Sequence, residues 1–257
     1  MPDTASYAPF GTEPADTPTF TVVIPALNEE ARLPQCLASV ASQVPDFSVE
    51  VLVVDNGSTD RTAEVARAAG VRVVSCARRG AVLARQMGLE RARGEILVHL
   101  DADSLLPSST LQLLARHFAN PGISAVVGDV QYVPGILGIR GMSKLYRSAN
   151  TFLNAIWGRP FFALAGALAM RREALVCSGG YATELPHSGD EAGILARLSK
   201  QGKIVWEPRF VVVSSDRRFR NRFGRWLTRD LLLHTFLDQT FHRVTKRSRW
   251  GDRPAIR

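Results

Sequence analysis

The first 120 residues alternate four times between a short apolar run and a longer stretch with helical periodicity. The apolar runs, rich in Val, Ile and Leu, lie at 20–25, 49–54, 71–75 and 95–100. Continuous runs of this kind are typical of strands buried on both faces of a parallel sheet. Helical patterns follow them at 34–43, from Asp60 to Gly70, at 80–93 and from Pro107 onward. The alternation predicts an α/β fold with a mostly parallel central sheet flanked by helices.

The second half is less regular. Expected strands lie at 123–130, 166–170, 203–206 and 209–214, the last two joined through Glu207-Pro208. Expected helices lie at 140–156, 190–201 and, with mixed basic and apolar positions, 222–243. We therefore expect three parts along the chain: a flexible leader at 1–18, an α/β domain at 19–215, and a basic, largely helical C-terminal extension at 216–257.

Several classes of protein are disfavoured by composition. The most apolar stretch, 151–170, is interrupted by Gly158-Arg159-Pro160, so we expect no transmembrane helix. The N-terminus places no Lys or Arg before an apolar run, unlike a secretory signal. The three cysteines are odd in number and far apart, which indicates a reducing compartment without disulfides or structural zinc. A cytoplasmic protein is expected.

The positive charge is concentrated at the C-terminal end. The formal net charge is +8, and residues 217–257 alone hold 12 Lys or Arg against three Asp. The other residues therefore sum to about −1. A basic segment of this kind binds phosphate, whether on a nucleotide, an anionic membrane surface or a nucleic acid.

Polar residues follow directly after three of the predicted strands. Asn28, Asp55 and Asp101 should lie along one edge, because the carboxyl ends of parallel strands meet there and ligands bind beyond them. Asp101 and Asp103 are two residues apart and would point the same way in an extended segment. Close carboxylates raise each other's pKa, and Mg²⁺ or Mn²⁺ would relieve the repulsion. The alternative is a helix cap with a solvated turn.

Four segments in this order carry a resemblance to a known family. They are IPALNEE (24–30), VVDNGSTD (53–60), RRGAVLARQMGLERARGEILVHLDADS (78–104) and DEAGILARLSKQG (190–202). Over about 19–215 the chain resembles the family 2 glycosyltransferases of the GT-A fold. The resemblance implies transfer of a sugar, usually with inversion, from a UDP- or GDP-sugar to a hydroxyl acceptor in the presence of Mg²⁺ or Mn²⁺.

The resemblance also implies roles for individual residues. Those near the donor would be Pro25, Ala26 and Glu29 at the nucleoside, Asp55 at the base and Arg85 in the following helix. Asp101 would face the ribose and the metal, and Asp103 would bind the metal on the diphosphate. Family members often have a further histidine ligand where this chain has Ser214-Ser215-Asp216. Asp216 would replace it, with Arg217 or Arg218 on the diphosphate; the alternative is a solvated basic turn.

The catalytic base implied by the family is the Asp of a Glu-Asp pair at the start of a helix. Aligning Arg197 and Gly202 places Asp190 and Glu191 at that pair, in reversed order. Glu191 takes the base position by register, and Asp190 is the alternative. Both would otherwise be acids favoured by the helix dipole.

The acceptor is the least constrained partner. An apolar stretch from Met142 to Phe162 would either pack in the core or meet a lipid-linked acceptor, with the Arg-rich tail on anionic headgroups. Peripheral contact with the inner face of the cell membrane is therefore one expectation.

Two rival functions remain. A sugar-1-phosphate nucleotidyltransferase would need a Gly-rich loop with Arg and Lys after the first strand, and residues 26–30 hold none of these. A nucleic-acid-binding module is disfavoured because residues 217–257 lack a recognisable motif, so no nucleic-acid partner is expected.

Overall fold

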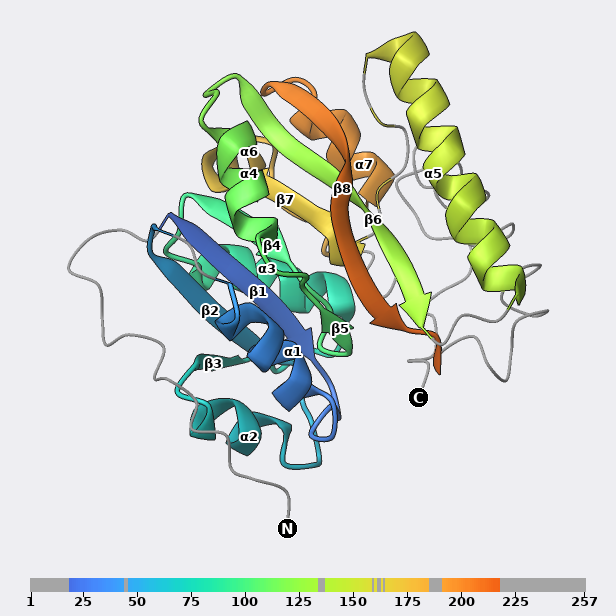
Figure 1. The fold of residues 1–257 in the computed structure, drawn as a ribbon. Coiled ribbons are helices and arrows are strands. Elements are labelled where there is room, and N and C mark those ends of the chain that lie inside the picture. Colours follow the sequence, from blue (N-terminus) through green and yellow to red (C-terminus); the bar gives the residue numbers. More distant parts are fainter. Residues whose placement is uncertain are drawn as a thin grey trace.

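The computed structural model describes residues 19–43, 46–133, 137–158, 160, 163, 165–184 and 191–217. The predicted leader at 1–18 and the extension beyond Arg217 lie outside these residues. The described part contains one eight-stranded sheet in the order β3-β2-β1-β4-β7-β6-β8-β5 (Figure 1).

One half of the sheet is parallel, as predicted. Its strands are β1 (Phe20–Ala26), β2 (Val49–Asp55), β3 (Arg72–Ser75) and β4 (Ile96–His99). The helices between them are α1 (Leu33–Ala41), α2 (Thr62–Ala68) and α3 (Ala81–Arg91). Gly70, with φ +74°, follows the end of α2, where a side chain would strain the left-handed backbone. The predicted α/β alternation is therefore confirmed.

The other half of the sheet is mixed. It contains β6 (Ile123–Val133), β7 (Leu168–Arg171), β8 (Lys203–Ser215) and the two-residue β5 (Ser104–Leu105). β7 lies between β4 and β6 and is antiparallel to both, whereas β6 and β8 are parallel. The remaining elements are α4 (Thr110–Phe118), α5 (Leu137–Trp157), η1 (Ala165–Ala167), α6 (Arg172–Cys177) and α7 (Glu191–Leu198).

Two expectations about this half were wrong in detail. The two strands expected around Glu207-Pro208 are one strand, β8, because an irregularity in its pairing between Trp206 and Val211 accommodates the proline. The helix expected from Pro107 begins at Thr110, whose N–H and hydroxyl donate to the Pro107 carbonyl. The two-residue strand β5 was not predicted.

Two apolar cores cover the two faces of the sheet. Val22 and Ile24 of β1 pack toward α1, α2 and α4, whereas Val23 packs toward α3, α6 and α7. Each side chain of this size contributes about 1.5–3 kcal/mol when fully buried. Because both faces are covered, the exposed functional groups lie at the strand ends. The pairing of Ala26 with Asp55 and of Val23 with His99 places the ends of β1, β2 and β4 at one edge.

Candidate active site

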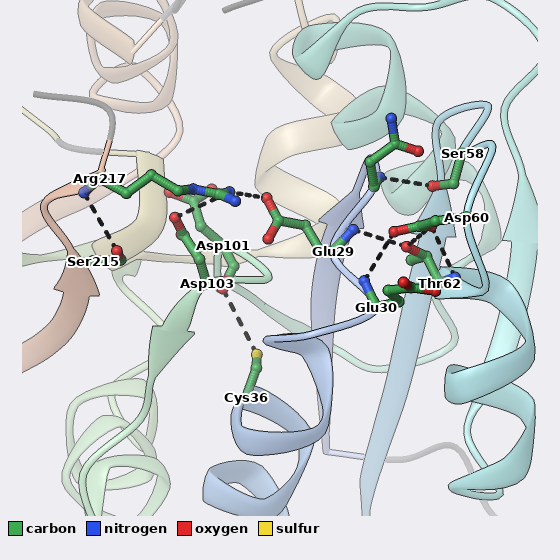
Figure 2. A network of polar contacts seen from close by, with 11 residues as sticks. Glu29, Glu30, Cys36, Ser58, Asp60, Thr62, Asp101, Asp103, Ser215 and Arg217 are labelled. Atoms are coloured by element: carbon green, nitrogen blue, oxygen red, sulfur yellow. Dashed lines mark hydrogen bonds and ion pairs between the residues drawn. The ribbon is translucent and has the colours of Figure 1, made fainter. Parts of the chain in front are cut away.

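The loops after β1 and β2 are held together by side chain–backbone hydrogen bonds (Figure 2). The N–H of Asn28 donates to Ser58 Oγ (3.0 Å), and Asn28 Oδ1 accepts from the N–H of Thr59 (2.8 Å). The N–H of Glu29 donates to Thr62 Oγ1 (2.8 Å). Asn28 adopts φ +56°, which asparagine tolerates better than most residues. The two predicted motifs therefore form one ordered edge.

The carboxylates of the second motif stabilise this edge. Asp60 accepts from the N–H groups of Glu30 (3.2 Å) and Thr62 (3.0 Å). Its burial opposes ionisation, but the hydrogen bonds from Thr62 and Glu30 lower its pKa. Asp55 Oδ1 accepts from the N–H of Ser58 (3.1 Å), so the predicted base-contacting residue is also part of its own turn.

Asn56 is a structural residue of the site that sequence reasoning missed. Its side-chain amide donates to the carbonyl of Arg78 (2.9 Å) and accepts from the N–H of Gly80 (2.8 Å). It therefore joins the end of β2 to the start of α3, the helix that carries Arg85. The available signal was an asparagine at the end of a predicted strand, and its burial in the structure explains why both ends of its amide are hydrogen-bonded.

Asp101 and Asp103 lie in a turn and not in an extended segment. β4 ends at His99, and the N–H of Ser104 donates to the carbonyl of Asp101 (2.9 Å). The prediction that simple strand alternation aligns the two carboxylates was therefore wrong. Their environments also differ, since the side chain of Asp103 is 4% exposed and that of Asp101 is 31% exposed.

Each of these carboxylates lies near an arginine. Arg85 Nη2, from α3, is 3.6 Å from Asp101 Oδ1. Arg217 Nη2, just beyond β8, is 3.6 Å from Asp103 Oδ2 and also pairs with Glu29. Figure 2 shows the Arg217 side chain extending across the edge of the site toward Glu29. Five predicted site residues thus form two groups of contacts at this edge: Arg85 with Asp101, and Arg217 with Glu29 and Asp103.

The thiol of Cys36 lies in an acidic environment at this edge. Burial raises the pKa of its thiol, and the charges of Asp101, Asp103 and Glu29 raise it further. The thiol lies 3.6 Å from the carbonyl oxygen of Asp101. Cys36 is therefore a packing residue beneath the carboxylates and is poorly suited to act as a nucleophile.

Gly166, in η1, permits the observed position of Asp101. A Cβ atom at this glycine would lie 3.0 Å from Asp101 Oδ2, which is tighter than most contacts of real side chains. This contact between the acid turn and the segment before β7 was not foreseen from the sequence. It depends on long-range packing.

His99 is buried at the end of β4 beneath the site. Its Nε2 lies 2.7 Å from the hydroxyl of Tyr181, and the two rings stack. Burial lowers the pKa of His99 to about 3, and the nearby positive charge of Arg85 adds to the effect. The ring is therefore neutral at pH 7 and orients Tyr181.

The chemistry of the acid turn suits a hard divalent cation. Mg²⁺ and Mn²⁺ are held by one or two carboxylates and complete their shell with water and phosphate oxygens. Asp101 and Asp103 supply two such carboxylates at an edge that also presents arginines. Within the described ranges, no group of three His, Cys, Asp or Glu side chains would hold a metal without outside ligands. Asp216 is buried, and its role as a further ligand stays a prediction.

The predicted bases fall at the limit of the described residues. Glu191 is the first residue of α7, but its side chain is outside the described part, as are Asp190 and Arg218. The structure thus tests neither base assignment.

No helix in the portion of the chain that the structure describes is both long and apolar enough to cross a bilayer.

Two curated relatives from Haloferax volcanii illustrate the sequence similarity. The low-salt glycan biosynthesis hexosyltransferase Agl6 is 40% identical over 206 residues, which cover 75% of this chain and 48% of Agl6. Glycosyltransferase AglE is 34% identical over 122 residues, which cover 45% of this chain and 40% of AglE. The chain thus spans less than half the length of these relatives.

Solved structures agree with the predicted GT-A fold. The mannosyltransferase PcManGT from Pyrobaculum calidifontis, in complex with GDP-Man and Mn²⁺, matches with a TM-score of 0.64 at 26% identity. The aligned region covers 81% of this chain and 59% of the PcManGT chain. The glucosyl-3-phosphoglycerate synthase from Mycobacterium tuberculosis, in complex with Mn²⁺ and UDP-glucose, matches with a TM-score of 0.55 at 28% identity. The aligned region covers 77% of this chain and 70% of the synthase chain. The fold prediction is confirmed.

The sequence model of glycosyl transferase family 2 matches residues 21–179, which run from β1 through β7 to just past α6. The match therefore includes both loops of the ordered edge, the acid turn and Gly166. Because this match covers more than half of the 257 residues, the chain belongs to glycosyl transferase family 2.

Proposed function

We propose that this protein transfers a hexose from a nucleotide-diphosphate-sugar donor to a hydroxyl acceptor, with inversion at the anomeric carbon. The observation that carries the proposal is the convergence of two carboxylates and two arginines, Asp101, Asp103, Arg85 and Arg217, beside the loops after β1 and β2. A nucleotide diphosphate needs a groove for the base and counter-charges for the phosphates. At this edge, the loops after β1 and β2 would hold the base, and the arginines and a metal ion on the carboxylates would balance the charge of the phosphates.

The donor would lie across the ends of β1 and β2. Pro25, Ala26, Glu29 and Asp55 would line the nucleoside, consistent with the pairing of Ala26 with Asp55. Arg217, together with Arg218, would then bind the diphosphate, because a guanidinium pairs with phosphate through two parallel hydrogen bonds. PcManGT was solved with GDP-Man and the synthase with UDP-glucose, so both nucleotides are candidates.

Asp101 and Asp103 would hold Mg²⁺ or Mn²⁺, with Asp216 as a further candidate ligand. The two solved relatives were determined in complex with Mn²⁺. Such an ion stabilises the negative charge that develops on the leaving diphosphate. Arg85 would position the Asp101 carboxylate, since Arg85 Nη2 lies 3.6 Å from Asp101 Oδ1.

Proton removal from the acceptor is assigned to Glu191, with Asp190 as the alternative. The first residue of a helix favours an ionised carboxylate, which is the form a base requires. Attack from the face opposite the departing diphosphate would invert the anomeric centre. The acceptor would be a saccharide or a lipid-linked hydroxyl compound, reached from the cytoplasmic side of the membrane.

We assign this activity to a domain at 19–215, with 1–18 as a leader and 216–257 as a basic extension. Thermal unfolding of the full chain in the presence of UDP- and GDP-sugars, with and without Mn²⁺, tests the donor. Ligands that bind the folded state raise Tm, so a shift that requires both nucleotide and metal is expected. The proposal fails if no nucleotide raises Tm in the presence of metal.

Product analysis separates the proposal from its rival. Release of the nucleoside diphosphate from a nucleotide sugar supports transfer. Release of pyrophosphate from a sugar 1-phosphate and a nucleoside triphosphate would instead identify a nucleotidyltransferase.

A further inference from the structure

Helix α5 turns its polar side toward the protein. The hydroxyl of Tyr146 donates to the carbonyl of Gly128 (3.4 Å), and Arg147 Nη2 donates to the carbonyl of Pro208 (2.8 Å). One turn further along, Thr151 Oγ1 accepts from Trp206 Nε1 (3.1 Å). Asn150 on the same side is fully buried. This inner face therefore joins α5 to β6 and β8 through hydrogen bonds, and the ring of Tyr146 also packs edge-on against Trp206.

The opposite side of α5 is apolar and exposed. Leu145, Phe152 and Ile156 are 69%, 65% and 57% exposed. They are spaced by seven and four residues, so they form one stripe along the helix. A surface helix of a globular protein normally shows the reverse arrangement, with its apolar stripe inward. A clustered apolar surface of this kind marks a site of interaction.

Helix α5 itself carries positive charge and no acidic residue. Its residues, Leu137–Trp157, include Arg140, Lys144 and Arg147 and no Asp or Glu. The basic segment that begins at Arg217 leaves the sheet nearby, because Val133 at the end of β6 pairs with Ser215 at the end of β8. α5 begins only four residues after Val133 and lies at the side of the molecule beside β6 (Figure 1).

We propose that the exposed stripe of α5 docks on an anionic lipid bilayer. Leu145, Phe152 and Ile156 would enter the boundary between headgroups and acyl chains, as in helices that lie in the plane of a membrane. The basic side chains of α5, a helix without acidic residues, would contact the acidic headgroups. This surface goes beyond the proposed sugar transfer, and it would bring the edge that holds Arg217 close to a membrane.

The charge pattern favours a bilayer over two other occupants. A second copy of the chain packed on this face would bring two acid-free, basic α5 helices together, which is unfavourable. The chain beyond Arg217 carries 11 Lys or Arg and three Asp, so packing it against α5 would also oppose like charges. An anionic lipid surface is complementary to both the apolar stripe and the positive charge of α5.

Co-sedimentation of the full chain with phosphatidylcholine vesicles, with or without phosphatidylglycerol, tests the proposal. We expect binding to the anionic vesicles and little binding to the neutral ones. Changing Leu145, Phe152 and Ile156 together to Ser should lower the partition coefficient on anionic vesicles about tenfold or more, because three apolar side chains no longer insert. Phe152→Ser alone should show part of this loss. Val176→Ser removes an apolar side chain that is 54% exposed on α6 and should leave binding unchanged.

Three outcomes would overturn the proposal. The first is wild-type binding by the triple variant, which would assign vesicle binding to the basic segment alone. The second is no binding of the wild type to anionic vesicles. The third is a dimer in sedimentation equilibrium that the triple variant abolishes while vesicle binding is unaffected, which would identify a second copy as the occupant. Because the assay contains no sugar donor, its failure is separate from a failure of the proposed transfer.

Discussion

The guanidinium of Arg217 lies 3.6 Å from the carboxylate of Asp103 and also pairs with Glu29. These residues come from three separate parts of the chain: the loop after β1, the turn after β4 and the end of β8. The contact joins the parallel half of the sheet to the mixed half at the candidate donor site. Arg217 therefore has two expected roles, as a counter-charge for buried carboxylates and as a phosphate ligand.

Arg217→Ala should weaken binding of the nucleotide-sugar donor by about 10- to 100-fold, because a charge-assisted hydrogen bond is worth about 1.5–3 kcal/mol. Calorimetric titration of UDP- and GDP-sugars with Mn²⁺ measures the change. Arg217→Lys should restore only part of the affinity, since an ammonium cannot form the paired hydrogen bonds. Arg61→Ala is the matched control, because Arg61 is 77% exposed and pairs only peripherally with Glu30. Equal losses in both alanine variants would contradict a specific role for Arg217.

Asp103→Asn and Asp101→Asn should each abolish most of the Mn²⁺-dependent rise in Tm that accompanies nucleotide binding. The amide cannot supply the charge that a divalent cation requires. Differential scanning fluorimetry with and without Mn²⁺ measures the effect. Asp129→Asn is a suitable control, because Asp129 is a buried carboxylate that pairs with Arg147 of α5. If both site variants keep the full metal-dependent shift, the acid turn is not the metal site.

Gly166→Ala should lower the transfer rate by displacing the Asp101 carboxylate, because the added methyl group would lie 3.0 Å from Oδ2. Steady-state kinetics should show a fall in kcat of about tenfold, which corresponds to about 1.4 kcal/mol. The same change in an Asp101→Asn background provides the control. A smaller effect there would show that Gly166 acts through Asp101, whereas additive effects would contradict that pathway.

Glu191→Gln should reduce kcat by about 100-fold or more, because an amide cannot accept the acceptor proton. Asp190→Asn should have a much smaller effect if Glu191 is the base. Donor binding should be nearly unchanged in both variants, which calorimetry with the nucleotide sugar would verify. Near-normal turnover of Glu191→Gln together with a large loss in Asp190→Asn would transfer the assignment to Asp190.

Glu207 should contribute to the pH dependence of stability. Hydrogen bonds from Arg209 lower its pKa from 4.5 to about 2 despite its burial, with His117 2.8 Å away as a further partner. A lowered folded-state pKa means that this stabilisation is present above about pH 4.5 and is lost as the pH falls toward 2.

The comparison of wild type with Glu207→Gln tests this contribution. The variant should have the lower Tm at pH 6, and the gap should narrow progressively between pH 4.5 and pH 3. A gap that stays constant over this range would show that the carboxylate charge is not the source of the stabilisation.

The strand–helix alternation and the place of the polar motifs could be predicted from local sequence. Continuous apolar runs predict buried parallel strands, and the carboxyl ends of such strands meet at one edge. This reasoning placed Asp55 and Asp101 correctly at the ends of β2 and β4. The resemblance to a family added residue roles that local physics alone does not distinguish.

The contacts across the site required the tertiary structure. Arg217 and Glu29 are 188 residues apart, and no periodicity relates them. The turn at Asp101, the approach of Gly166 and the antiparallel insertion of β7 likewise depend on packing between distant segments. The sequence by itself therefore determined which groups stand at the strand ends, because this follows from local periodicity. Only the tertiary structure decided which of them meet, because those contacts arise from the way the two halves of the sheet pack together.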